Sequence, residues 1–305
     1  MKDQAERLRQ IIDGLKLHQA ASQINMLNSE SAQNKSARVI AVTSGKGGVG
    51  KTNVTINLAI ALSELGKRVI ILDADFGLAN VDVLFGITPK FTLVDVIYNR
   101  KSLFEVLADG PRNIKFISGG SGVEDLVKLE STHRERFIEN IGLLDKLADI
   151  ILIDTGAGLS ENVMSFVMAA DEILLVTTPE PTSITDAYVL IKMVSKRDKD
   201  KVIKVVINRA ENANEANDIL NKLCVVAEKF LALKLNPLGY ILQDEAVPRA
   251  VKLQQPFSLS FPKSQASKHI MDISRKLVDS KGNRLQSEDT GIRNFVKRFF
   301  NSITM

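Results

Sequence analysis

Apolar residues in this chain gather into short continuous runs, and segments of helical periodicity lie between those runs. The runs are rich in β-branched residues and leucine, which is typical of strands buried on both faces of a parallel sheet. They occupy residues 38–43, 68–72, 113–117, 149–153, 172–177, 202–207 and 238–242. The helical segments lie at about 53–65, 133–147, 160–170, 184–196, 213–232 and 264–279. The alternation predicts an α/β fold built on a doubly wound, mostly parallel sheet.

Polar segments separate this core from both ends of the chain. Residues 22–36 and 280–290 carry too few apolar side chains to order themselves, so we interpret them as linkers. They divide the chain into a core at 37–279, an N-terminal segment at 1–21 and a C-terminal segment at 291–305. Each linker therefore tethers a short appendage to one folded domain.

Composition disfavours several classes of protein. The formal net charge of +4, with 25% charged residues, gives no broad footprint for nucleic acid. The one cysteine, Cys224, allows neither an internal disulfide nor a four-thiolate metal site within one chain. The sequence has no run of about twenty apolar residues and no signal peptide, so we expect a cytoplasmic protein.

The stretch Ser44 to Thr52, SGKGGVGKT, stands between the first strand and the first helix. It fits GxxxxGK[ST], in which glycines turn backbone N–H groups toward one anion and the helix N-terminus adds partial positive charge. Lys51 would supply a full charge, and the Thr52 hydroxyl can ligate Mg²⁺. The predicted nucleotide-binding residues are Gly45, Lys46, Gly47, Gly48, Val49, Gly50, Lys51, Thr52 and Asn53.

Three aspartates stand at the ends of predicted strands. Asp154 ends the run 150–153, and Asp73 and Asp75 follow the run 69–72. Because the carboxyl ends of parallel strands meet at one edge, these carboxylates should face the phosphates and hold Mg²⁺ or orient the attacking water. Each aspartate alone would more often be a solvated residue or a helix cap. Three of them in one phosphate-loop chain favour the metal site.

The residues after a late strand indicate the base. Phosphate-loop GTPases usually show Asn-Lys-x-Asp at this place, whereas this chain has Asn208-Arg209-Ala210-Glu211. The missing aspartate favours adenine, with Asn208 reading the edge of the base and Arg209 lying over its ring.

The motifs SGKGGVGKT, LDADFGLANVDVLFG at 72–86 and ILIDTGAGLS at 151–160 together resemble the MinD/ParA ATPases with a deviant Walker A motif, which have the SIMIBI-type fold. Over about residues 37–275 the chain is most similar to FlhG-type flagellar-number regulators. The resemblance implies an ATP-sandwich homodimer in which Lys46 reaches the partner's phosphates. It assigns catalysis to Lys46, Lys51 and Asp75, Mg²⁺ to Thr52, Asp73 and Asp154, adenine to Asn208, and the remaining nucleoside pocket to loops that include Pro179 and Glu180.

Electrostatics supports that role for Lys46. Two lysines ~4 Å apart repel by about 1–4 kcal/mol unless both face the triphosphate. A cation supplied by the partner would act like an arginine finger, so hydrolysis would wait until two ATP-loaded copies meet. The alternatives are a solvated loop lysine and a scaffold that does not hydrolyse ATP, and Asp75 and Asp154 argue against the scaffold.

The C-terminal segment, GIRNFVKRFFNSITM, is amphipathic. Its apolar face comprises Ile292, Phe295, Val296, Phe299, Phe300 and Ile303. A helix of about 18 Å is too short to cross a ~30 Å bilayer core, so we expect it to lie on the membrane surface, more stably when a dimer carries two copies. The alternative is a helix packed on the core, against which the hydrophilic linker argues. The resemblance supports the membrane, because MinD and FlhG proteins end in a membrane-targeting helix.

The N-terminal segment contains DQAERLR at 3–9, which resembles the activator element of FlhG proteins. The resemblance implies that it stimulates the signal-recognition-type GTPase FlhF through Asp3, Gln4, Ala5, Leu8 and Arg9. Other implied partners are flagellar C-ring components, a FleQ-type transcription activator and anionic inner-membrane lipids, with no direct nucleic acid.

These expectations describe an ATP- and Mg²⁺-dependent switch that regulates flagellar number or placement, peripheral on the cytoplasmic face of the inner membrane. One alternative is a MinD-type ATPase that positions cell division. A partition protein that binds DNA is disfavoured by the near-neutral charge, and an iron–sulfur reductase by the solitary Cys224.

Overall fold

The computed structural model describes residues 36–75, 80–98, 100–120, 126, 129, 131–280 and 290–303. The predicted N-terminal segment and nearly all of both predicted linkers lie outside these residues. The chain divides between Ser36 and Ala37, and the unit that begins at Ala37 holds every described element. The predicted domain bounds stay predictions.

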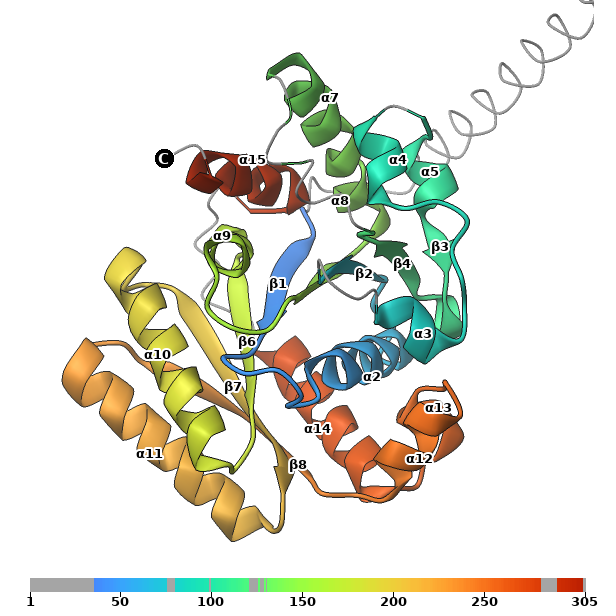
Figure 1. Ribbon diagram of the computed structural model, residues 1–305. Helices are drawn as coiled ribbons and strands as arrows, with labels where there is room; N and C mark the ends of the chain where they lie inside the picture. Colours follow the sequence, from blue (N-terminus) through green and yellow to red (C-terminus); the bar gives the residue numbers. More distant parts are fainter. Residues whose placement is uncertain are drawn as a thin grey trace, which may run out of the picture. The chain divides into compact units, whose positions relative to one another are not determined.

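A sheet of eight strands forms the centre of this unit within the described residues, in the order β3-β4-β2-β5-β1-β6-β7-β8 (Figure 1). All neighbouring pairs are parallel except β3 with β4. The strands are β1 (Arg38–Thr43), β2 (Val69–Ala74), β3 (Ala108–Asp109), β4 (Lys115–Ser118), β5 (Ile150–Thr155), β6 (Glu172–Thr177), β7 (Val202–Ala210) and β8 (Leu235–Leu242). The predicted doubly wound, mostly parallel α/β fold is confirmed.

Helices cover both faces of the sheet because alternate residues of each strand point to opposite sides. On one side, Ile40 and Val42 of β1 pack in a cluster with α2 (Lys51–Glu64) and α14 (Gln265–Asp279). On the other side, Val39 and Ala41 pack in a cluster with α9, α7 and α15. The elements of that second side are α7 (Ser131–Gly142), α8 (Leu144–Leu147), α9 (Glu161–Ala169), α10 (Pro181–Arg197), α11 (Ala213–Leu231) and α15 (Ile292–Ile303).

Short elements were missed by the periodicity, which needs at least two turns of helix to be visible. They are α3 (Val81–Phe85), α4 (Leu93–Ile97), α5 (Leu103–Val106), a 3-10 turn at Pro111–Asn113, α12 (Ala246–Lys252), α13 (Phe257–Ser260) and the two-residue strand β3. The helix predicted at 133–147 is two helices, which are separated at Leu143. The other predicted helices agree with the structure to within about three residues.

The C-terminal helix α15 is packed against the core. Ile292, Phe295, Val296, Phe299 and Phe300 are all 5% exposed or less. The ring of Phe166 on α9 lies 4.3 Å from the Phe299 ring and 6.1 Å from the Phe295 ring, measured between centroids. The argument that a hydrophilic linker would keep this helix off the core is therefore wrong, because a polar tether does not prevent an apolar face from docking. No described helix has the length and apolarity needed to cross a membrane.

Candidate nucleotide-binding site

The predicted phosphate loop follows β1 at the carboxyl edge of the sheet and leads into α2 (Figure 1). Gly50 stands at the N-cap of α2 with a φ of 88°, a left-handed conformation that favours glycine. Gly45 lies so close to α10 that an added Cβ atom would stand 2.4 Å from the carbonyl carbon of Asp186. The loop therefore presents bare backbone at a helix N-terminus, which is the geometry that binds phosphate.

Lys51 and Asp154 form a buried ion pair behind this loop. Lys51 Nζ donates to Asp154 Oδ1 at 2.9 Å, and Thr55 Oγ1 donates to the same oxygen at 2.8 Å. The side chains of Lys51 and Asp154 are 6% and 0% exposed. The other carboxylate oxygen, Asp154 Oδ2, is buried and has no hydrogen-bond partner among the described residues. A buried carboxylate oxygen left unpaired is costly, so the site is incomplete without a ligand.

That unpaired oxygen fits the predicted magnesium ion. Mg²⁺ prefers oxygen ligands and usually combines one or two carboxylates with substrate phosphates and water. The described residues contain no cluster of three or more histidine, cysteine or acidic side chains that would hold a metal unaided. A metal at this edge would therefore be held by Asp154, by the Thr52 hydroxyl at the start of α2, and by the nucleotide itself.

Asp73 lies beside Asp154, because the two residues are register partners on adjacent strands β2 and β5. Its carboxylate accepts backbone N–H groups from Asp75 at 3.1 Å, Asn80 at 3.1 Å and Val81 at 3.2 Å. Burial, with the nearby Asp154 charge, raises the pKa of Asp73 to about 7. Asp73 thus fastens the start of α3 in this structure, and its role as a magnesium ligand stays a prediction.

Asp75 directly follows β2, and its role in orienting the attacking water stays a prediction. Its Oδ2 accepts from Asn80 Nδ2 at 3.4 Å, and its Oδ1 lies 3.6 Å from the position of a Cβ atom added to Gly156. The structure therefore brings the loops after β2 and β5 together at one point. Residues 76–79 lie outside the described residues.

Lys46 is held within its own chain. Its Nζ donates to Glu180 Oε2 at 2.9 Å and to Thr182 Oγ1 at 3.0 Å, both at the start of α10. The hydrogen bond from Lys46 lowers the pKa of Glu180. The repulsion expected between Lys46 and Lys51 is avoided without nucleotide, because each lysine has a carboxylate of its own. Sequence reasoning placed Pro179 and Glu180 in the nucleoside pocket and missed this pairing.

Asn208 braces the phosphate loop from the end of β7. Its Nδ2 donates to the Val49 carbonyl at 2.7 Å, and its Oδ1 accepts the N–H of Arg209, which has a φ of 58°. The predicted adenine contacts of Asn208 and Arg209 stay predictions. Their position beside the loop is compatible with a base bound nearby.

Comparison with known proteins now places this loop, with its buried Lys51–Asp154 pair, in a family. The model of the family described as "ParA: NUBPL iron-transfer P-loop NTPase" matches residues 35–278. The chain belongs to the ParA family of P-loop NTPases. A thiolate-held iron cluster would need more than the one cysteine of this ParA-family chain.

Relatives of this ParA-family chain include two flagellar proteins. The chain is 45% identical to "Antiactivator FleN" of Pseudomonas aeruginosa over 243 residues, which cover 80% of the chain and 86% of the relative. It is 34% identical to "Flagellum site-determining protein YlxH" of Helicobacter pylori, covering 92% of the chain and 97% of the relative. The structure of MinD complexed with Mg-ADP from Pyrococcus horikoshii is similar with a TM-score of 0.63 and 26% identity, covering 82% of the chain and 98% of that structure.

Thr55 is a site residue that the sequence analysis missed. It lies one helical turn after Lys51 and donates to Asp154 and not to solvent. The signal was available, because a buried hydroxyl at i+4 from a phosphate-loop lysine shares a helix face with it. The predicted activator residues Asp3, Gln4, Ala5, Leu8 and Arg9 lie outside the described residues.

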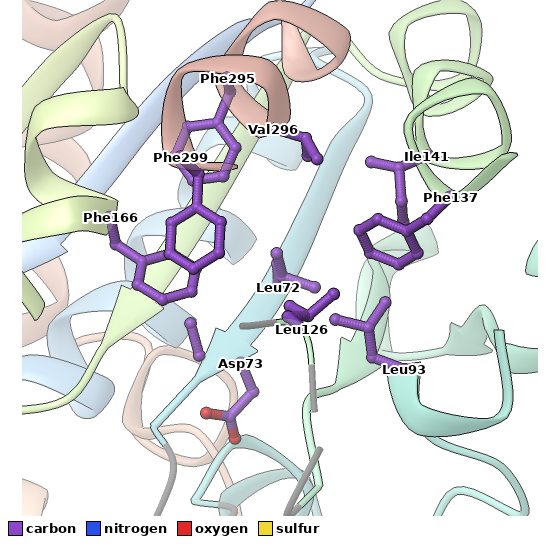
Figure 2. Close-up of a pocket in the computed structure, with 11 residues that line it drawn as sticks. Leu72, Asp73, Leu93, Leu126, Phe137, Ile141, Phe166, Phe295, Val296 and Phe299 are labelled. Carbon is purple, nitrogen blue, oxygen red and sulfur yellow. The ribbon is translucent and has the colours of Figure 1, made fainter. Parts of the chain in front are cut away.

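A small apolar cavity links the nucleotide edge of this ParA-family fold to the docked helix. Figure 2 shows Asp73 at one end of it and Phe295, Val296 and Phe299 of α15 across from Phe166. The remaining lining residues are Leu72, Ala74, Leu93, Leu126, Phe137 and Ile141. The cavity therefore reaches from the underside of α15 to the carboxyl end of β2.

Proposed function

We propose that the chain is an ATP-hydrolysing dimerisation switch that regulates the number or placement of flagella. The observation that carries the ATPase is the buried Lys51–Asp154–Thr55 group, with one carboxylate oxygen left unpaired behind a phosphate loop. The flagellar role is supported by the similarity to FleN and YlxH along most of both chains. The similarity to MinD keeps a role in placing the division site as the alternative.

The chain's own residues divide the work of hydrolysis. Backbone N–H groups of the loop and Lys51 bind the phosphates, while Asp154 and Thr52 would hold Mg²⁺, which would supply charge neutralisation. Asp75 orients the attacking water. Lys46 leaves Glu180 and reaches the phosphates bound by a second copy, so hydrolysis is slow until two copies meet.

In this proposal, α9 transmits the effect of dimerisation from the phosphate loop to α15. Ser160 caps α9 directly after the loop that follows β5, and Gly158 N in that loop donates to Ser44 O of the phosphate loop at 3.0 Å. Phe166 on the same helix packs between Phe295 and Phe299. A shift of the loop around the γ-phosphate would move Phe166 and loosen the docked helix, because packed helices move as rigid bodies.

Released copies of α15 then attach the dimer to anionic lipid on the cytoplasmic face of the inner membrane. Two helices on one particle bind with a high effective concentration, whereas one is marginal. In the attached state, the N-terminal segment would stimulate an FlhF-type GTPase. C-ring components and a FleQ-type activator are the other proposed partners.

The proposal is tested by sedimenting the full chain with a slowly hydrolysed ATP analogue and with ADP, in the presence and absence of vesicles of phosphatidylglycerol and phosphatidylethanolamine. We expect dimers and vesicle binding with the analogue only. Lys46→Ala should abolish both, whereas Lys101→Ala, at an exposed pair with Glu105, should change neither. A wild-type chain that stays monomeric with the analogue would contradict the mechanism.

The flagellar assignment needs its own test, because a division-site ATPase would pass the first one. Deleting the gene should change the number of flagella per cell, and Asp154→Asn should reproduce that change. Minicells with normal flagella would favour the alternative.

A further inference from the structure

Two half-buried aspartates hold the C-terminal helix in place, and the first of them is Asp145 on α8. Asp145 Oδ1 accepts the N–H of Ile292 at 2.9 Å, and Oδ2 accepts the N–H of Arg293 at 3.3 Å. These are the first two residues of α15, whose N–H groups have no partner within the helix. Asp145 therefore caps α15 from a different part of the chain.

The second aspartate, Asp171, lies between α9 and β6. Its Oδ1 accepts from Arg298 at 2.8 Å, and Arg298 Nε also donates to Ala169 O at 2.8 Å. Because Ala169 is the last residue of α9, Arg298 also satisfies a carbonyl at that helix end. The polar side of α15 is thus fastened at its start and near its middle.

Both aspartates also hold the beginning of β1. Asp145 Oδ1 accepts the N–H of Ala37 at 3.1 Å, and Asp171 Oδ2 accepts the N–H of Val39 at 2.9 Å. Each carboxylate is therefore shared between the first residues of the folded unit and its last helix. The chain that precedes Ala37 is covalently attached at this same place.

Apolar burial alone does not decide where α15 lies. Phe295, Phe299 and Phe300 leave water in the core groove and would also leave it in a lipid layer, so that contribution largely cancels between the two states. The polar contacts do not cancel. A lipid surface attracts Arg293, Lys297 and Arg298, but it offers no carboxylate placed to cap the helix start.

We propose that Asp145 and Asp171 form a latch that sets how readily α15 leaves the core, and that opening it also loosens residues 37–39, to which the N-terminal segment is joined. The proposal rests on the membrane role of α15 for its biological meaning, but the latch is a property of the folded chain alone. Release of α15 removes two of the three backbone donors to Asp145 and the Arg298 partner of Asp171. The remaining bonds to Ala37 and Val39 then become open to water, which weakens them.

The test measures amide hydrogen exchange of the full chain without lipid or nucleotide. Variants Asp145→Asn, Asp171→Asn and the double variant are compared with Asp149→Asn, a control on the neighbouring loop whose side chain pairs with Arg68. We expect exchange of residues 292–300 and of residues 37–39 to rise together, by about tenfold for each single variant, because each loses a charge-assisted hydrogen bond. The control should leave both segments as in the wild type.

Vesicle binding without nucleotide gives the second measurement. The double variant should bind phosphatidylglycerol vesicles at least about tenfold more strongly than the wild type, since the docked state competes less well. Arg298→Gln opens the same latch from the helix side without altering the core, and it serves if Asp145→Asn does not fold. Unchanged exchange at 292–300 in Asp171→Asn and Arg298→Gln would overturn the latch, and faster exchange there with unchanged exchange at 37–39 would overturn the coupling.

The outcomes separate this inference from the proposed function. If the wild type never binds vesicles with an ATP analogue while the variants free both segments, the membrane role fails and the latch stands. If the wild type switches normally but the variants behave like Asp149→Asn, the latch fails and the proposed function stands.

Discussion

The nucleotide site and the docked C-terminal helix differ in how complete they are. At the nucleotide site, Asp154 Oδ2 and Thr43 Oγ1 are buried without a partner among the described residues. Along α15, the apolar face is covered, the helix start is capped by Asp145, and Arg298 is paired with Asp171. The unpaired polar atoms of the nucleotide site need a ligand to satisfy them. The contacts of α15, by contrast, must be broken before its apolar face can bind anything else.

In the proposed switch, this difference is what would let ATP act as a signal. Ligand binding is favourable where polar groups are unsatisfied, and that free energy is then available to break contacts elsewhere. A ligand can shift the docked helix only by as much as it prefers the released state. In the proposed switch, the phosphate site therefore supplies the driving force and the contacts of α15 set how much free energy is needed for release.

Removal of Lys51 is expected to have the largest effect on this difference between the two regions. Lys51→Ala leaves the buried Asp154 charge with the Thr55 hydroxyl but without its cation, so we expect a loss of about 3–5 kcal/mol in the free energy of unfolding without nucleotide, together with loss of ATP hydrolysis. Urea unfolding and phosphate release measure the two effects. Lys115→Ala, at an exposed pair with Asp109, is the control and should cost less than about 1 kcal/mol. An unchanged unfolding midpoint would show that the pair is not a structural necessity.

Phe166→Ala tests the other region. Truncating this buried ring should cost about 3–5 kcal/mol if α15 stays docked over the cavity, and less if α15 simply leaves. We expect the smaller cost, accompanied by vesicle binding without nucleotide and by normal ATP binding. The control is Phe230→Ala, since that ring is 65% exposed on α11. A full cost with no gain in vesicle binding would mean that Phe166 does not control docking.

Lys201 reports on the docked helix through pH. Its Nζ donates to Met168 O and Ala170 O, and burial, with repulsion from Arg298, lowers its pKa from 10.5 to about 8. The unfolded chain therefore binds more protons between pH 8 and 10.5, so stability should rise with pH in that window, by up to about 1 kcal/mol per unit. Urea unfolding at pH 8 and 9.5 measures the rise. Lys201→Met should remove it, and Arg298→Gln should reduce it.

Glu180→Ala is expected to have the smallest effect. It frees Lys46 from its own chain, so dimers should form at about threefold lower concentrations of an ATP analogue, as for loss of one exposed ion pair. Analytical ultracentrifugation measures the shift. Glu161→Ala, at another exposed pair with Arg197, should leave the dimerisation midpoint in place. A higher midpoint in Glu180→Ala would indicate that Glu180 assists nucleotide binding.

Local spacing made the phosphate site largely predictable from sequence. A loop of fixed length between a strand and a helix determines where Lys51 points, and strand ends determine where Asp73 and Asp154 meet. The partner of Lys46 could not be found this way, because Glu180 is 134 residues away and only the β1–β6 pairing brings the two together.

The apolar face of α15 was also predictable, but its neighbour was not. Periodicity identifies Phe295 and Phe299 as one face without saying whether lipid or protein covers it. That choice depends on Asp145 and, in a second part of the chain, on Phe166 and Asp171, all far in sequence from α15. The short helices were missed for a related reason. A helix of only a few residues is stabilised by tertiary contacts more than by its own sequence pattern.

The position of β1 has a consequence for how such proteins diversify. This six-residue strand, about 20 Å long, leads into the catalytic loop at one end and is gripped by the two aspartates at the other. The first residue of the folded unit and the start of α15 are therefore attached at the edge of the sheet opposite the phosphate loop. In the proposed switch, a change in either terminal segment can redirect the protein without touching the residues that hydrolyse ATP.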